Sequence, residues 1–258
     1  MKRLNLLADK RQVFLSVLVT ITFMVTFFVP KFYAYVIFGK DEFNALSQYY
    51  KVAICHGTNL LLCFLVAFYI AEFSFKKMFD MLGMSKGIFM AFALALLSAL
   101  PQLLGMQYLH GFNYDASFAD FWFMGVHPGY YEEIVFRGFL IGMLVRFAKW
   151  PAMIPLVLSS LFFGIGHLYQ ANNMNESIAI FLTAFGAGAG FYLFYTYSNW
   201  NLWFPLFLHS FMDISTTISN YHGNITMGFQ DNIFRVTTIL CAIFISYRLK
   251  KKAKTESI

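Results

Sequence analysis

The sequence predicts an all-α, polytopic membrane helix bundle with about eight transmembrane helices. Of its 258 residues, 59% are hydrophobic and only 12% are charged, whereas soluble domains carry roughly 25% charged residues. A transmembrane helix needs about 20 mostly apolar residues, so this length suits about eight spans joined by short loops. No stretch reads as a linker or a soluble domain. We therefore expect a single membrane domain over residues 1–258.

Eight long apolar runs, taken in chain order, predict the transmembrane helices. Pro101 lies inside the third run and is expected to kink it. The sequence His127-Pro128-Gly129 is expected to break the chain before the fourth run, because proline disfavours a helical residue before it and glycine loosens the turn. The expected spans cover about residues 13–29, 52–70, 87–106, 129–147, 151–169, 178–197, 201–218 and 233–247.

The net charge of +6 indicates membrane orientation, not nucleic-acid binding. A nucleic-acid surface needs basic residues on one soluble face, whereas here they gather at the chain ends and in loops. Because cytoplasmic loops are enriched in Lys and Arg, we expect a multi-pass protein of the plasma membrane with both termini cytoplasmic. The residues concerned are Lys2, Arg3, Lys10, Arg11, Lys76, Lys77, Lys86, Arg146, Lys149, Lys250, Lys251, Lys252 and Lys254.

Several small or polar residues are interpreted as packing residues. The three cysteines form no CxxC pair and lie in or beside apolar runs, where cysteine behaves as a small hydrophobe. Gly186 and Gly190 have the GxxxG spacing that lets helix backbones touch. Histidines at span ends or in loops are assigned no role; they are His56, His110, His127 and His222.

Two adjacent carboxylates and an arginine lie within the fourth apolar run. Ionisable residues inside a bilayer are costly, so they indicate a functional site. Glu133 and Arg137 are four residues apart and share a helix face, which suits an ion pair. Glu132 points about 100° away and is free to act as a base. The alternative is a structural charge network that holds helices together.

Two further polar positions lie in later spans. His167 follows two glycines that allow a neighbouring helix to approach, although a lone histidine on an apolar helix is also compatible with a core residue. His209 and Asp213 are four residues apart on one face, so the carboxylate can orient the imidazole. A buried His–Asp pair without chemistry is the alternative.

Together these positions resemble the CPBP family of intramembrane proteases, also called the Abi family, which includes the CAAX prenyl endopeptidases. The family pattern is EExxxR on one helix, FxxxH on a later one and HxxxN or HxxxD on a third. The resemblance covers a core of about residues 129–215. The three motifs of this chain read Glu132-Glu133-x-x-x-Arg137, Phe163-x-x-x-His167 and His209-x-x-x-Asp213.

The resemblance implies a peptidase in which a glutamate and a histidine activate water. Carried over by position, Glu132 is the general base and His167 helps to hold the water. Glu133 and Arg137 then fix the geometry of the site.

The third motif implies stabilisation of the oxyanion. His209 and Asp213 are expected to polarise the scissile carbonyl, and Asp213 is expected to orient His209, since an ionised carboxylate cannot donate a hydrogen bond. By the expected spans, Glu132 and His167 lie toward the end opposite Arg146, which places the site in the outer half of the membrane.

The sequence leaves the cofactor open. Glu132, His167 and His209 are candidate ligands for Zn²⁺ with one position left for water. No span carries the HExxH pairing of a secure zinc site, so we expect no obligatory metal.

We therefore predict an intramembrane endopeptidase that hydrolyses a peptide bond of a membrane-associated protein or peptide. One alternative is a catalytically silent relative, a membrane immunity or regulatory protein of the same fold. A transporter with a carboxylate proton relay is less favoured, because the two halves of the chain show no internal repeat.

Overall fold

The computed structural model describes the backbone of residues 6–255 and, within that range, the side chains outside residues 6–9, 31 and 252–255. Lys2 and Arg3, and the side chains of Lys252 and Lys254, lie outside the described residues, although the predicted orientation uses them. The described chain is helical and contains no strand, which confirms the all-α prediction.

The long helices follow the expected apolar runs, and short helices that were not predicted lie between them. The α-helices are α1 (Leu6–Phe28), α2 (Pro30–Phe38), α3 (Lys40–Ala45), α4 (Gln48–Ile70), α5 (Phe75–Leu82), α6 (Ile88–His110), α7 (Phe118–Asp120), α8 (His127–Glu132), α9 (Met153–Gly166), α10 (Met174–Tyr197), α11 (Trp203–Thr217) and α12 (Phe229–Thr255). The π-helical segments are η1 (Phe121–Val126), η2 (Glu133–Ile141) and η3 (Met143–Phe147), and η4 (Leu168–Gln170) is a 3₁₀ turn.

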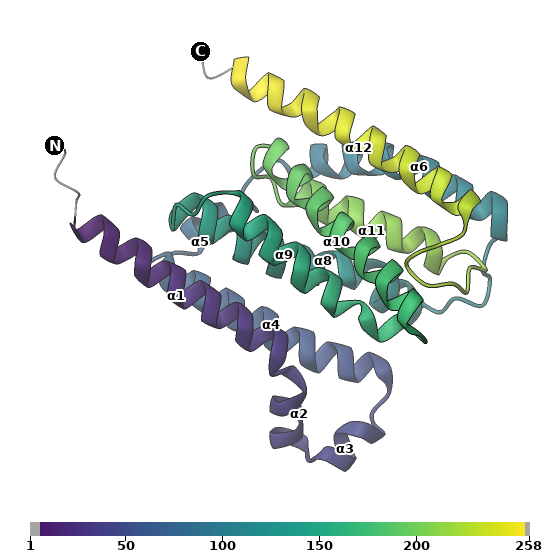
Figure 1. Cartoon of the computed structure of the whole chain (residues 1–258), viewed down its shortest axis with the longest axis horizontal. Helices are drawn as coiled ribbons and strands as arrows, with labels where there is room; N and C mark the ends of the chain where they lie inside the picture. The colour runs from purple at the N-terminus through teal and green to yellow at the C-terminus, as the bar shows by residue number, and fades with distance from the viewer. Residues whose placement is uncertain (1–5, 256–258) are drawn as a thin grey trace.

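The long helices form three layers (Figure 1). On one side α1 packs along α4, and the short helices α2 and α3 extend from one end of this pair. On the other side α6 packs against α12. The middle layer contains α8, α9, α10 and α11; α9 packs on α10, and α11 packs on both α6 and α8. The middle layer therefore contains the helices with the predicted site residues.

Within the described residues, six helices are long and apolar enough to cross a membrane, judged by length and composition. This agrees with an integral, multi-pass membrane protein. The other two expected spans are helical as well, but they do not meet that measure. One of them, α11, has only 15 residues, and the other is the charged segment around Glu132. The candidate spans are 10–28, 48–70, 88–110, 153–170, 174–197 and 229–251.

Residues 118–147 form one run of helical turns, which we call the central helix. The predicted break at His127-Pro128-Gly129 is wrong, because Val126 and His127 both have right-handed helical backbone angles. Pro128 lies in the first turn of α8, just after the π-helical segment η1. The missing proline N–H thus falls where the hydrogen-bond pattern already changes, and the fixed φ of proline suits a first helical turn.

This correction moves Glu132 and Glu133 relative to the membrane. They lie in the middle of the central helix, not near its start. The predicted site in the outer half of the membrane assumed that these two residues were near a helix start, so that argument no longer applies to them. His167 does lie at a helix end, directly after the last residue of α9.

Candidate active site

Gly129 lets the central helix pack directly against α11. A Cβ atom at this position would lie 2.3 Å from the Ser210 Oγ and 2.6 Å from the Ser210 backbone nitrogen. The Ser210 hydroxyl also donates a hydrogen bond to the Val126 carbonyl oxygen at 3.1 Å. The glycine that sequence reasoning took for a helix breaker is therefore a contact point between two helices, a few residues before Glu132 and Glu133.

His209 lies among three carboxylates. Its Nδ1 is 2.9 Å from Glu133 Oε1, and because a carboxylate accepts, the imidazole donates there. Its Nε2 is 3.8 Å from Glu132 Oε2 and 3.6 Å from Asp213 Oδ2. Asp213 lies one turn further along α11, whereas Glu133 faces the ring from the central helix. The shorter orienting contact thus comes from Glu133 and not, as predicted, from Asp213.

Arg137 is completely buried beside Glu133. Its Nη1 lies 3.0 Å from Glu133 Oε1, so the expected ion pair is present, and its Nη2 donates to the Gly188 carbonyl oxygen at 3.2 Å. The guanidinium carbon is 4.7 Å from the centre of the Phe163 ring and 5.3 Å from that of Phe191. Aromatic faces attract a cation, so these rings help to hold Arg137 in the protein interior.

Gly188 has a structural role that the GxxxG pattern did not identify. A Cβ atom at Gly188 would lie 2.9 Å from the Ser160 Cα on α9, whereas one at Gly186 would meet nothing within 4 Å. The close approach between α9 and α10 is therefore centred on Gly188. The same residue supplies the carbonyl oxygen that accepts from Arg137.

Exposure increases from one side of the site to the other. The side chains of Arg137 and Glu133 are 0% exposed, that of Glu132 is 19% exposed and that of Asp213 is 32% exposed. Glu132 Oε2 is buried and has no hydrogen-bond partner among the described residues. A buried carboxylate oxygen without a partner is costly, so this atom is suited to accept a hydrogen bond from water that enters on the Asp213 side.

His167 lies at the edge of this group. Its Nδ1 is 2.7 Å from the Phe163 carbonyl oxygen, so Nδ1 carries the hydrogen and the neutral ring leaves Nε2 as an acceptor. The Phe163 ring is 4.7 Å from the His167 ring and 6.2 Å from the His209 ring. Within the described part of the chain, no hydrogen bond or ion pair joins His167 to Glu132 or His209. The structure thus brings five of the six predicted residues together and leaves His167 beside them.

A second histidine cluster adjoins the central helix and was missed by sequence reasoning. His56 Nδ1 lies 2.9 Å from His127 Nε2. The Tyr131 ring stacks on His56 with 3.7 Å between the ring centres, and Asn59 donates to the Tyr131 hydroxyl at 2.9 Å. His56 and His127 are far apart in sequence, so no spacing pattern could have indicated this pair.

The three predicted metal ligands, Glu132, His167 and His209, are not gathered into a metal site among the described residues. Among the residues that the structure describes, no group of three or more His, Cys, Asp or Glu side chains is arranged to hold one. His209 and His167 each use Nδ1 for a hydrogen bond, to Glu133 and to a backbone carbonyl, so Nε2 is the ring atom of each that faces other partners.

One comparison with known protein families finds a similarity that covers this site. Residues 114–215 match the family model described as Rce1-like, Type II CAAX prenyl endopeptidase Rce1-like. The match extends from the loop before the central helix into α11 and includes all six predicted site residues. No curated protein and no solved structure matches the chain. Over residues 114–215 the chain is thus similar to the Rce1-like CAAX prenyl endopeptidases, which supports the resemblance to the CPBP family of proteases.

Proposed function

We propose that this protein is an intramembrane endopeptidase that hydrolyses a peptide bond of a membrane-associated protein or peptide. The observation that carries this proposal is the unpartnered Glu132 Oε2, which lies 3.8 Å from His209 Nε2 within the family segment. A carboxylate with a free lone pair beside an imidazole is the combination that general-base activation of water requires.

In the proposed reaction, Glu132 accepts a proton from water while the water oxygen attacks the scissile carbonyl carbon. A protonated His209 donates from Nε2 to the oxygen that becomes negative, which stabilises the tetrahedral intermediate. The carbon–nitrogen bond then breaks, and Glu132 returns its proton to the leaving amine. The products are a carboxylic acid and an amine, so atoms and protons balance without a further reactant.

The other predicted site residues position and charge the two reacting side chains. Glu133 Oε1 accepts the hydrogen bond from His209 Nδ1 and forms the ion pair with Arg137 Nη1, and it thereby sets the orientation of the imidazole ring. Asp213 lies beside His209 Nε2 and favours its protonated form by charge. His167, with Nε2 free to accept, lies at the edge of the site and contacts the water or the substrate. We propose that no metal takes part.

The position of the site in the central helix and the nearby basic residues bear on the substrate and the location of the protein. A peptide that reaches the middle of the central helix must enter the membrane or pass along its surface, so the partners are a membrane-associated substrate and lipid. The basic residues at the Arg146 end favour a plasma-membrane protein with that end, and both termini, in the cytoplasm.

The test is cleavage of fluorescence-quenched membrane peptides by the purified protein in lipid nanodiscs. We expect Glu132→Gln and His209→Asn each to lower kcat by about 10²- to 10⁴-fold, the usual contribution of a general acid or base. Glu42→Gln and His222→Asn change exposed residues of the same types and should cleave like the wild type.

Two outcomes would count against the proposal. Wild-type rates in folded Glu132→Gln and His209→Asn would instead support the silent regulatory relative. Loss of activity in a chelator, restored by Zn²⁺ alone, together with bound zinc in the purified protein, would refute the metal-free mechanism but not the peptidase.

A further inference from the structure

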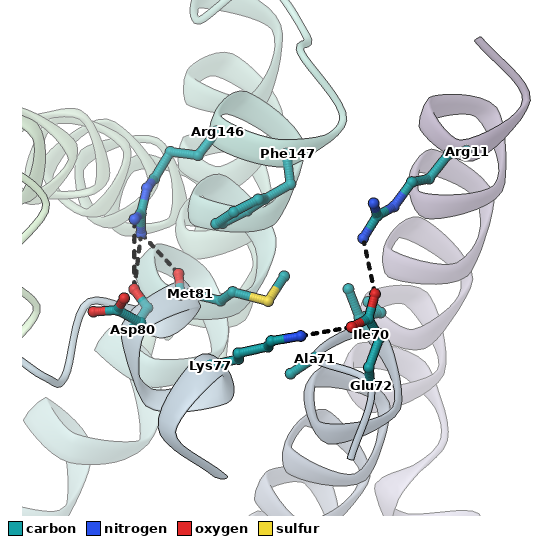
Figure 2. A pocket seen from close by; sticks show the side chains of 9 residues that line it. All are labelled: Arg11, Ile70, Ala71, Glu72, Lys77, Asp80, Met81, Arg146 and Phe147. Carbon is teal, nitrogen blue, oxygen red and sulfur yellow. Dashed lines mark hydrogen bonds and ion pairs between the residues drawn. The ribbon is translucent and has the colours of Figure 1, made fainter. Parts of the chain in front are cut away.

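Two adjoining cavities open at the end of the molecule opposite the start of the central helix, away from the candidate active site. They have volumes of about 380 Å³ and 220 Å³ and lie between α1, α5 and η3. Figure 2 shows the larger one, with Arg11 on α1 pointing to Glu72, Arg146 on η3 pointing to the Asp80 and Met81 carbonyl oxygens, and Lys77 reaching in from α5. The residues common to both cavities are Arg11, Ile70, Met81, Arg146 and Phe147.

The larger cavity is lined by charges of both signs, but its acidic groups already have partners. Glu72 lies 2.6 Å from Lys77 Nζ and 3.9 Å from Arg11 (Figure 2), and its hydrogen bond with Lys77 lowers the pKa of Glu72. The Asp80 carboxylate accepts a hydrogen bond from the Ser85 hydroxyl. The smaller cavity has three cationic lining residues and no acidic one: Arg11, Arg146 and Lys149.

Arg146 is held in place without being neutralised. Its Nη1 donates to the Met81 carbonyl oxygen at 2.8 Å, and it also contacts the Asp80 carbonyl (Figure 2). Lys149 Nζ in turn donates to the Arg146 carbonyl oxygen at 2.7 Å. In the described structure no carboxylate forms an ion pair with Arg146 or Lys149. Burial and the nearby Arg146 charge lower the pKa of Lys86, in line with an unneutralised cation.

The same cavities have apolar walls beside the cations. Leu15 and Ile70 lie on two candidate spans, and Phe147 ends the central helix. The cavities therefore lie at the level where spanning helices end, between headgroups and acyl chains. Basic pockets between transmembrane helices at this level bind anionic headgroups. A free phosphate ion would use only the cations, whereas a lipid would also cover the apolar wall.

We propose that this pocket binds the phosphate headgroup of an anionic phospholipid, with Arg11, Arg146 and Lys149 as its cations. An acyl chain then lies along Leu15 and Phe147. The site is independent of the proposed peptidase activity.

The test measures lipid retention by the purified full-length protein with native mass spectrometry, comparing phosphatidylglycerol with phosphatidylcholine. We expect retention of phosphatidylglycerol by the wild type and about 30-fold weaker retention by Arg11→Gln with Lys149→Gln, since each of the two surface cations contributes on the order of 1 kcal/mol. This variant keeps the hydrogen bonds that the Arg146 side chain donates to the Met81 and Asp80 carbonyl oxygens and loses the one from Lys149 to the Arg146 carbonyl oxygen. The matched control, Arg248→Gln with Lys250→Gln, removes two exposed cations from α12 and should retain lipid like the wild type.

Three results would overturn the proposal. Equal retention of the two lipids by the wild type would exclude a headgroup site. Equal loss in the control variant would assign the effect to general surface charge. Displacement of phosphatidylglycerol by millimolar inorganic phosphate would identify a small-anion site instead. A change in peptide cleavage in the Glu132 variants bears only on the peptidase proposal.

Discussion

At the scale of single residues, the sequence predicts contacts within one helix better than contacts between helices. The Glu133–Arg137 ion pair follows from a four-residue spacing and is present at 3.0 Å. The contact between Glu133 and His209 depends on how the central helix packs against α11, which no spacing encodes. The paired His56 and His127 were missed for the same reason.

Arg137 should contribute strongly to stability because Glu133 is buried with it. We expect Arg137→Met to lower the free energy of unfolding by roughly 3–5 kcal/mol, the usual cost of leaving one partner of a buried ion pair alone. Adding Glu133→Gln should recover part of this loss, since no unpaired charge then stays buried. Denaturant unfolding in detergent, read through a double-mutant cycle, measures both effects. A double variant no more stable than Arg137→Met alone would argue against a charge-based role.

At the scale of elements, the central helix was the least predictable part. Pro128 and Gly129 together usually indicate the end of a helix, but here proline occupies a first turn after a π-helical segment and glycine faces α11. Local preference was overridden by tertiary packing. The other long helices follow apolar runs, so their existence was readable and only their bounds moved, whereas the short helices α2, α3, α5 and α7 were not predicted.

Gly129→Ala should therefore affect activity more than overall folding. The added Cβ would lie 2.6 Å from the Ser210 backbone nitrogen, so the two helices must separate, at a cost of about 1–3 kcal/mol for overpacking. The same separation moves Glu132 and Glu133 away from His209. We expect a small drop in melting temperature and a large drop in peptide cleavage.

Gly186→Ala on α10 is the matched control, because its Cβ would meet nothing within 4 Å. It should leave both cleavage and melting unchanged. If Gly129→Ala also cleaves at the wild-type rate, the contact between α8 and α11 does not position the site.

At the scale of the whole molecule, composition predicted the class of protein, and charge predicts its orientation. The 12% of charged residues and the apolar runs are enough to indicate a multi-pass bundle. Which helices cross the membrane is harder to read, because α11 has only 15 residues and the central helix carries Glu132, Glu133 and Arg137.

The orientation can be tested at two loops that lie at opposite ends of the central helix. Tyr114 is 89% exposed in the loop before that helix, and Ala152 is exposed in the basic loop after it. In a variant whose three cysteines are replaced, a membrane-impermeant maleimide applied to intact cells should label Tyr114→Cys. Ala152→Cys should be labelled only after the cells are permeabilised, because Arg146 and Lys149 keep its loop in the cytoplasm. The reverse pattern would invert the bundle and place the proposed lipid pocket in the outer leaflet, where the surface carries far less anionic lipid.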